Sequence, residues 1–171
     1  NSTVCLYDGS PFYPNSDILW EYADKEKFNF FGTSAKYIDA LSKFKNKVSK
    51  KFLLENLEVI GSTGSPLVHE SFDYVYNNVK KDVHLASLSG GTDIVGCFVG
   101  GNPISSVYRG EIQGPILGMD VHVYDDDGNS IQNKKGELVC IQSFPTMPLY
   151  FWNDKNNNKY HDAYFDKYSN V

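Results

Sequence analysis

Short apolar runs alternate with longer amphipathic segments through residues 1–98, and this alternation limits the possible folds more than any other feature. The runs Phe28 to Phe31, Leu57 to Ile60 and Val83 to Leu88 are typical of buried strands. Apolar residues at helical spacing lie between them, after Ser34, which we expect to cap a helix, and again from about Leu67 to Val79. Strands joined by helices imply crossover connections, so we predict a parallel sheet in an α/β fold.

The pattern changes after residue 98, where helical periodicity disappears. Asp120 to Tyr124 alternates between polar and apolar residues, Asp125 to Gly128 is typical of a turn, and Gly136 to Gln142 is typical of a further strand. We therefore expect an α/β part over residues 1–98 and a smaller β-rich part, hairpin-like or barrel-like, over residues 99–171.

Charge and composition exclude several classes of function. The net charge is −5, and Arg109 is the single arginine among 16 basic residues, so a nucleic-acid binder is not expected. No apolar run approaches the roughly 20 residues that a membrane span requires. The three cysteines are far apart and odd in number, which favours a reducing compartment and a cytoplasmic protein.

Two glycine-rich segments directly follow predicted strands. They are Gly61 to Pro66 and Ser89 to Asp93. Open α/β sheets bind ligands at the carboxyl ends of their strands, where such segments begin. We therefore expect the two segments to lie side by side at one edge of the sheet, where they would form a ligand site.

The first segment, Gly61 to Pro66, has the residues of a turn that binds a ligand through its backbone groups. Its glycines permit close approach of a flat ligand, whose base edge the backbone N–H and C=O groups would then contact. It lacks the lysine of the phosphate-binding loop with the pattern G-x-x-x-x-G-K-S/T. The alternative is a plain strand-to-helix turn, with Pro66 at the first helical position.

The second segment joins a hydroxyl to a carboxylate on a glycine turn. Thr92 is placed to donate to a phosphate oxygen, and Asp93 is placed to hold Mg²⁺ directly or through water. The alternative is an Asx-type turn or a helix cap without a ligand.

Several motifs occur together in the order and spacing of a known family. The chain resembles the acyl-adenylate-forming enzymes, the AMP-dependent acyl-CoA synthetases, in Tyr7–Pro11, Phe31–Ser34, Gly61–Pro66 and Gly91–Asp93. The likeness continues through Cys97–Pro103, Tyr108–Gln113, Gly136–Cys140, Phe144–Pro148 and Phe151–Asp154 and covers almost the whole chain. The fold that it implies is part of the large N-terminal domain of an acyl-CoA synthetase.

The resemblance implies a two-step ligation. ATP and a carboxylic acid give an acyl-adenylate and pyrophosphate with the help of Mg²⁺, and the thiol of coenzyme A then displaces AMP. Thr92 is the implied catalytic contact to the α-phosphate, and Asp93 is the implied catalytic and metal residue. Nucleotide-binding roles fall on Gly64, Ser65, Pro66, Ser87, Ser89, Gly91 and Thr92.

Three positions depart from the pattern of the family. Ser89 stands where many relatives stack an aromatic ring on adenine, which is worth on the order of 1–3 kcal/mol. Gly90 stands where acetate-specific relatives carry a tryptophan that closes the acyl pocket, so we expect room for acetoacetate. Asp93 replaces a glutamate and shortens the reach of the carboxylate by one methylene.

Residues 1–171 contain neither the upstream phosphate-loop lysine nor the downstream adenylation lysine that the resemblance implies. We therefore expect a central fragment of a longer enzyme, inactive by itself and prone to self-associate through exposed cut faces. Two alternatives stay open. One is a synthetase for another short or medium acyl group, and the other is a non-catalytic nucleotide-binding module of the same fold.

Overall fold

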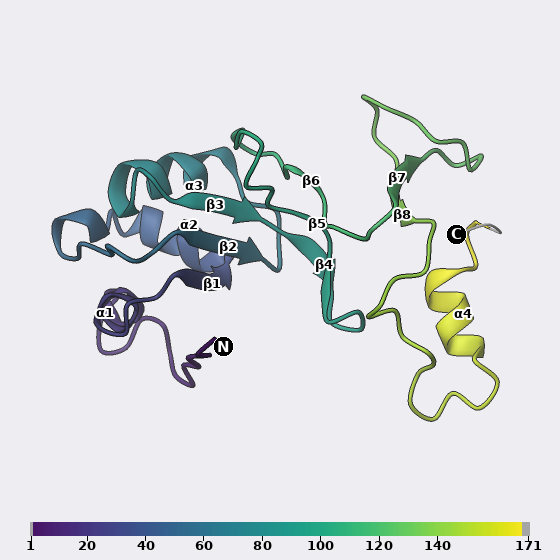
Figure 1. Cartoon of the computed structure of the whole chain (residues 1–171), viewed down its shortest axis with the longest axis horizontal. Helices are drawn as coiled ribbons and strands as arrows, with labels where there is room; N and C mark the ends of the chain where they lie inside the picture. Colours follow the sequence, from purple (N-terminus) through teal and green to yellow (C-terminus); the bar gives the residue numbers. More distant parts are fainter. Residues whose placement is uncertain (1, 169–171) are drawn as a thin grey trace. The chain divides into compact units, whose positions relative to one another are not determined.

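Two compact units make up the chain, and a computed structural model describes residues 2–168 of it (Figure 1). The first unit runs through Ser87 and also takes in the segment Pro103–Ile112. The second unit comprises Leu88–Asn102 and the chain from Gln113 onward.

A three-stranded parallel sheet in the order β1-β2-β3 forms the centre of the first unit, as the sequence predicted (Figure 1). Each pair of consecutive strands is joined by a helical crossover. The elements in chain order are α1 (Ile18–Lys25), β1 (Phe30–Ser34), α2 (Ala35–Lys43), the 3₁₀ turn η1 (Val48–Lys50), β2 (Val59–Thr63), α3 (His69–Tyr74), the π-helical turn η2 (Val75–Val79) and β3 (His84–Ser87).

A polar side chain precedes both α1 and α2, but only the one before α2 caps its helix. Ser34 caps α2, because its Oγ accepts a hydrogen bond from the Tyr37 backbone N–H at 3.2 Å. Asp17 precedes α1 but makes no capping bond with its side chain. Its carboxylate instead accepts hydrogen bonds from Lys51 Nζ at 2.5 Å and Asn46 Nδ2 at 2.8 Å, which ties the start of α1 to the region of η1.

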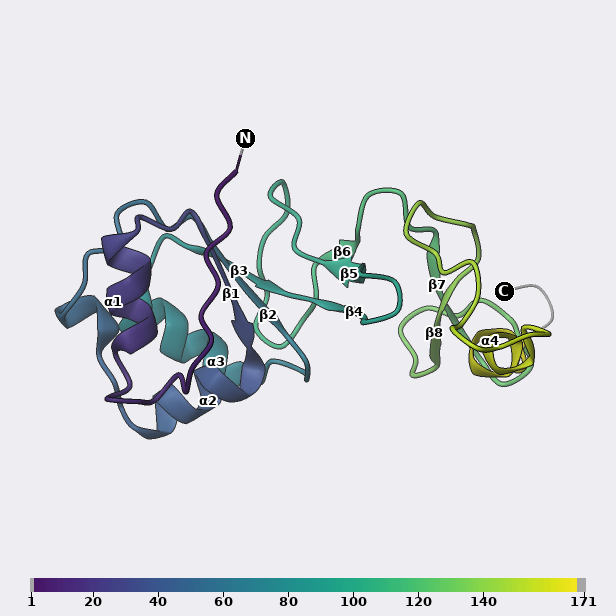
Figure 2. The same ribbon diagram turned by 90° about the horizontal axis from the view of Figure 1, so that it is seen from below.

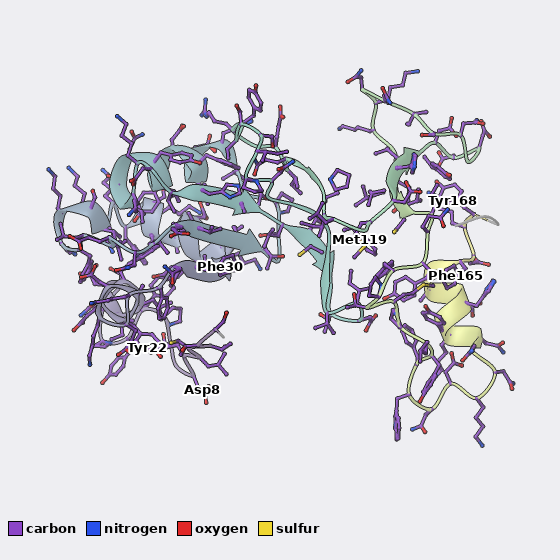
Figure 3. The ribbon with its side chains drawn as sticks, in the orientation of Figure 1. Asp8, Tyr22, Phe30, Met119, Phe165 and Tyr168 are labelled. Atoms are coloured by element: carbon purple, nitrogen blue, oxygen red, sulfur yellow. The ribbon has the colours of Figure 1, made fainter. Side chains whose placement is uncertain are left out.

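The sheet of the first unit has one buried face and one more open face. Phe31, Ile60 and Leu85 are register partners and are all buried in the core, where Trp20 of α1 stacks on Phe31 with ring centroids 4.7 Å apart. The helices α2 and α3 contact each other over this core (Figure 2). On the opposite face Phe30, labelled on β1 in Figure 3, is 55% exposed.

The second unit contains two small antiparallel sheets and one helix. In the first sheet β5 (Gly96–Gly100) lies between β4 (Ser89–Gly91) and β6 (Gly114–Pro115). The second sheet pairs β7 (Val121–Tyr124) with β8 (Glu137–Cys140), and the helix α4 is Asn158–Tyr164.

The turn predicted at Asp125 to Gly128 is confirmed. Gly128 has φ +81°, and Asp125 Oδ1 accepts hydrogen bonds from the backbone N–H groups of Asp127 at 3.1 Å and Asn129 at 2.8 Å. These hydrogen bonds, led by the one from Asn129, lower the pKa of Asp125 because they stabilise its ionised carboxylate.

Two local predictions differ from the structure. The helix expected from about Leu67 begins at His69, because Val68 is still extended, with ψ 158°. Ser89–Gly91, expected as a turn, is a strand that pairs antiparallel with β5.

The return segment, which we define as Pro103–Ile112, explains why the units do not divide between residues 98 and 99. Val107 packs against the core of the first unit, and Arg109 Nη2 lies 2.7 Å from Asp73 Oδ2 on α3. Gly110, with φ +76°, approaches the His69 ring so closely that a Cβ would lie 2.4 Å from Nε2. Meanwhile β5 pairs with β4 in the second unit.

Candidate functional site

The carboxyl ends of β1, β2 and β3 meet at one edge of the first sheet. Ser34 is in register with Thr63, and Ser62 is in register with Ser87, so hydroxyl side chains end all three strands. The Ser34 hydroxyl is already engaged as the cap of α2. Parallel sheets place ligands at this edge, which makes it a candidate for one half of a binding site.

Gly64 forms the turn that follows β2 at this edge. Its φ of +84° lies in the region that favours glycine, and a Cβ built there would meet nothing within 4 Å. Ser65 is half-buried and Pro66 is exposed, whereas Ser87 at the neighbouring strand end is 8% exposed. The backbone of the Gly64 turn is therefore open to a flat ligand, and Ser87 belongs to the same sheet edge.

The β4–β5 hairpin of the second unit carries the other predicted site residues. Ser89 and Gly91 are exposed on β4, and Thr92 and Asp93 are exposed on the turn that follows. The turn closes with a hydrogen bond from Val95 N–H to the Thr92 carbonyl at 3.2 Å. Thr92 and Asp93 thus occupy a hairpin turn, where both side chains face solvent.

Gly90 lies at the most crowded backbone position of this hairpin. A Cβ added to Gly90 would lie 2.0 Å from the Gly96 carbonyl oxygen and 2.5 Å from Cys97 Cα. The ladder also contains a bulge between Ser89 and Gly90. The absence of a side chain at position 90 is therefore required by the hairpin itself, a reason that is independent of any acyl pocket.

The Asp93 carboxylate has a partner that the sequence did not reveal. The Tyr164 phenolic O–H on α4 donates a hydrogen bond to Asp93 Oδ2. This hydrogen bond, together with partial burial, raises the pKa of Tyr164 to about 12, so the phenol is protonated at neutral pH. In sequence the only signal was an aromatic cluster at helical spacing, Tyr160 and Tyr164, which indicates packing and not a polar role.

The residues around Asp93 fit a magnesium site in which the protein supplies a single carboxylate. Within residues 2–168, no three His, Cys, Asp or Glu side chains lie close enough together to enclose a metal ion. Mg²⁺ in nucleotide sites usually keeps several waters and takes one or two carboxylates plus phosphate oxygens. Asp93 alone is consistent with this arrangement, since Tyr164 engages Oδ2 and leaves Oδ1 as a ligand atom.

A cavity of about 520 Å³ lies within the second unit, close to this pair. Residues from the hairpin, from β8 and from α4 line it, including Ile94, Phe98, Val139, Phe144, Tyr160 and Tyr164. Ile94 is 4% exposed and adjoins Asp93, so the turn that carries the carboxylate is anchored by an apolar side chain.

The predicted site residues thus form two groups. Gly64, Ser65, Pro66 and Ser87 belong to the first unit, while Ser89 to Asp93 belong to the second. The expected convergence of the two glycine segments stays a prediction.

No family model matches the chain, but curated proteins match it along nearly its whole length. It is 55% identical over 170 residues to the acetoacetyl-coenzyme A synthetase of Rhizobium meliloti (strain 1021), and the aligned residues make up 99% of this chain and 26% of that protein. It is 44% identical over 170 residues to the acetoacetyl-CoA synthetase of Mus musculus, with coverages of 99% and 25%. The chain spans about a quarter of the length of these relatives.

Solved structures agree with the fold. The acetoacetyl-CoA synthetase from Streptomyces lividans superposes with a TM-score of 0.86 at 38% identity, over 95% of this chain and 26% of that one. An anthranilate CoA ligase in complex with anthranoyl-AMP superposes with a TM-score of 0.73 at 18% identity, over 92% of this chain and 28% of that one. At this level of identity the likeness shows the fold alone. The resemblance to acyl-adenylate-forming ligases is confirmed by these similarities.

Among the residues that the structure describes, no helix has the length and apolar character needed to cross a bilayer.

Proposed function

We propose that this chain supplies part of the nucleotide site of an acetoacetate–CoA ligase. The observation that carries the proposal is the 55% identity over 99% of the chain to a relative named acetoacetyl-CoA synthetase. In the first step a carboxylate oxygen of acetoacetate attacks the α-phosphorus of ATP, and pyrophosphate leaves. In the second step the sulfur of coenzyme A attacks the acyl carbon, and AMP leaves.

The first unit would hold the adenine of ATP or AMP. Gly64, Ser65 and Pro66 would line one face of the base, which is supported by the open backbone at Gly64. Ser87 would lie near the exocyclic amino group, which is supported by its place at the same sheet edge. Fixed backbone groups suit this task because they orient a base without losing side-chain entropy.

The second unit would act on the phosphates. Thr92 would donate its hydroxyl to the α-phosphate, Asp93 would hold Mg²⁺ through Oδ1, and Ser89 and Gly91 would flank the nucleotide. Bound Mg²⁺ neutralises the charge that shifts onto pyrophosphate. The exposure of Thr92 and Asp93 on the hairpin turn supports these roles, because a phosphate must reach both side chains.

Gly90 would border the acyl group in this scheme. A glycine leaves more room than an indole, which agrees with acetoacetate as the acid in place of acetate. The crowding of Gly90 against Gly96 and Cys97 means that a larger residue would also move the hairpin, so acyl preference is better tested by varying the substrate than by varying this residue.

The proposal is tested with a chimera in which this chain replaces the matching segment of the Rhizobium meliloti protein. We expect the purified chimera to release pyrophosphate and form acetoacetyl-CoA in the presence of ATP, Mg²⁺, acetoacetate and coenzyme A. Thr92→Val and Asp93→Asn should each lower kcat at least tenfold, while Asp126→Asn, on the exposed β7–β8 turn, should not.

The outcomes separate the alternatives. A higher kcat/KM with acetate, propionate or butyrate than with acetoacetate would assign a different acyl group. A folded chimera without adenylation of any of these acids would favour a non-catalytic nucleotide-binding module and would contradict the proposed function.

The chain by itself is expected to lack steady ATP-dependent pyrophosphate release and to self-associate. Large exposed side chains such as Leu117, Leu149 and Trp152 supply apolar surface for this association. Sedimentation velocity at increasing concentration measures it, and a single monomeric species throughout would contradict the expectation. Three unpaired cysteines support a cytoplasmic setting, and the proposed partners are small molecules, without nucleic acid or membrane.

A further inference from the structure

The hydrogen bond between Tyr164 and Asp93 links two residues that are 71 positions apart in sequence and that lie in the same unit. Asp93 is exposed on the hairpin turn, where an unrestrained carboxylate samples several rotamers. Tyr164 fixes one of its two oxygens. Tyr164 can hold Asp93 in place only if α4, the helix that carries Tyr164, is itself well fixed.

The helix α4 is anchored in that way near its start. The Tyr160 backbone N–H donates to Asp154 Oδ2 at 2.9 Å, and the Tyr160 hydroxyl donates to the Pro148 carbonyl at 2.7 Å. The Tyr160 side chain is 9% exposed, so both bonds lie in a protected setting. The first turn of α4 is thereby tied to the loop that precedes it.

Aromatic packing then fixes the direction of the Tyr164 ring. Its centroid lies 5.7 Å from that of Tyr160 and 5.8 Å from that of Phe151, with edge-to-face geometry in both cases. Phe165, labelled in Figure 3, also packs edge-on against Tyr160. The phenol is therefore held by its ring as well as by the hydrogen bond from its hydroxyl to the hairpin.

The other end of the pair is anchored as well. Ile94, which follows Asp93, is buried at 4% exposure. Both the hairpin turn and the helix are thus fixed by buried side chains, and the hydrogen bond joins the two exposed groups that extend from them.

We propose that Tyr164 is a positioning residue for Asp93, whose hydroxyl holds Oδ2 so that Oδ1 is presented in one orientation to the magnesium–phosphate group of the nucleotide. This inference rests on the proposed function, in which Asp93 is the magnesium ligand. Groups that orient a metal ligand in this way typically contribute roughly 10- to 100-fold to metal affinity or activity.

The experiment uses Tyr164→Phe in the complete protein that contains this chain. The substitution removes one hydroxyl and keeps the ring, so the packing of α4 is retained. Tyr168→Phe is the matched control, because its hydroxyl donates to the Asp125 backbone carbonyl at 3.0 Å and does not reach the hairpin. Asp93→Asn and the double variant Tyr164→Phe/Asp93→Asn complete a double-mutant cycle.

Two readouts are measured for each variant. The first is the affinity for Mn²⁺ in the presence of a non-hydrolysable ATP analogue, followed by electron paramagnetic resonance. The second is the rate of pyrophosphate release at varied Mg²⁺ and at varied acetoacetate, which gives the Mg²⁺ concentration needed for half-maximal rate and the KM for acetoacetate. Melting temperature reports whether a variant is folded.

We expect Tyr164→Phe to weaken Mn²⁺ binding about tenfold and to raise the Mg²⁺ concentration needed for half-maximal rate, with the melting temperature and the KM for acetoacetate unchanged. Tyr168→Phe should bind Mn²⁺ as the wild type does. The loss caused by Tyr164→Phe should disappear in the Asp93→Asn background, since the hydroxyl then has no metal ligand to orient.

An unchanged Mn²⁺ affinity in Tyr164→Phe, or an equal loss in both backgrounds, would overturn the positioning role. Failure of the proposed function has a different signature. A wild-type protein that binds Mn²⁺ and the ATP analogue but forms no acetoacetyl-CoA would contradict that function and still allow the cycle to decide the role of Tyr164.

Discussion

At the scale of single residues, Gly90 of the β4–β5 hairpin combines a predicted place beside the acyl group with a backbone too crowded for a side chain. Gly90 was interpreted from sequence as a widened acyl pocket, whereas the structure adds a steric demand from Gly96 and Cys97. The sequence could not reveal that demand, because it depends on which strand pairs with residues 89–91. The pairing of β4 with β5 was itself unexpected.

Gly90→Ala is expected to destabilise the protein by about 1–3 kcal/mol, because its Cβ would force the two strands of the hairpin apart. Gly114→Ala on β6 is the control, since a Cβ there meets nothing within 4 Å. Urea denaturation of both variants measures the difference. Equal stability of the two variants would show that the hairpin yields without cost.

The predictability of the candidate site also differs residue by residue. The glycine turn at Gly64 and the pair Thr92 and Asp93 could be proposed from sequence, because glycine and hydroxyl–carboxylate patterns are local, and their binding roles stay predictions. The contact of Tyr164 with Asp93 was missed, because the two residues are 71 positions apart. Local chemistry can be inferred from neighbouring residues, whereas a hydrogen bond between distant residues can be identified only once the fold is known.

At the scale of elements, the helices and strands of the first unit were largely predictable. Ser34 was expected to cap a helix, and its Oγ does so. The strand ends were less predictable: β1 begins two residues later than the apolar run that starts at Phe28, because Phe28 packs beside the core instead of joining the sheet. The π-helical turn η2 has no local signal that separates it from an α-helix.

Ser34→Ala is expected to cost about 1 kcal/mol of stability, because the Tyr37 backbone N–H would lose its partner. Ser34→Asp should retain most of the stability, since aspartate is also a good N-cap residue. Ser42→Ala, near the other end of α2, is the control and should be nearly neutral. Chemical denaturation measures all three, and equal losses for Ala at 34 and 42 would contradict the capping role.

The link between Asp17 and Lys51 predicts a pH-dependent stability. Burial acts to raise the pKa of Asp17, but hydrogen bonds from Lys51 and Asn46 and the charge of Lys51 together lower it below its ordinary value of 3.8. A carboxyl whose folded pKa is lowered stabilises the fold above its unfolded pKa, and this contribution is lost as the pH falls through the folded value.

Lys51→Met should therefore destabilise the protein at about pH 7 and pH 5, by no more than about 1 kcal/mol because the pair is partly exposed. The difference from wild type should shrink as the pH falls below the ordinary carboxyl value and Asp17 becomes protonated. Lys50→Met removes the same charge one residue away and is the control. A constant difference across this whole range of pH in urea denaturation would contradict the assignment.

At the scale of the whole molecule, the chain passes between the two units three times. The first unit takes in Pro103–Ile112 from within the sequence of the second. A boundary between residues 98 and 99 was expected from the loss of helical periodicity, which is a local signal. The packing of Val107 and the ion pair of Arg109 with Asp73 are non-local and leave no trace in that periodicity.

Val107→Asp is expected to loosen the first unit, because a charge would replace an apolar side chain that packs on its core. Hydrogen exchange followed by mass spectrometry should show faster exchange in α3 and η2, without change in β7 and β8. Tyr108→Ser, whose side chain is 63% exposed in the same segment, should exchange as the wild type does. Faster exchange confined to the second unit would contradict this role of the return segment.

The return segment also sets an order of events during synthesis. A ribosome releases residues from the N-terminus onward, and domains generally fold as they emerge. Within residues 1–171, the return segment leaves the exit tunnel only after the whole β4–β5 hairpin has been made. Translation must therefore deliver the predicted phosphate-contacting turn before the return segment can pack on the unit expected to hold adenine.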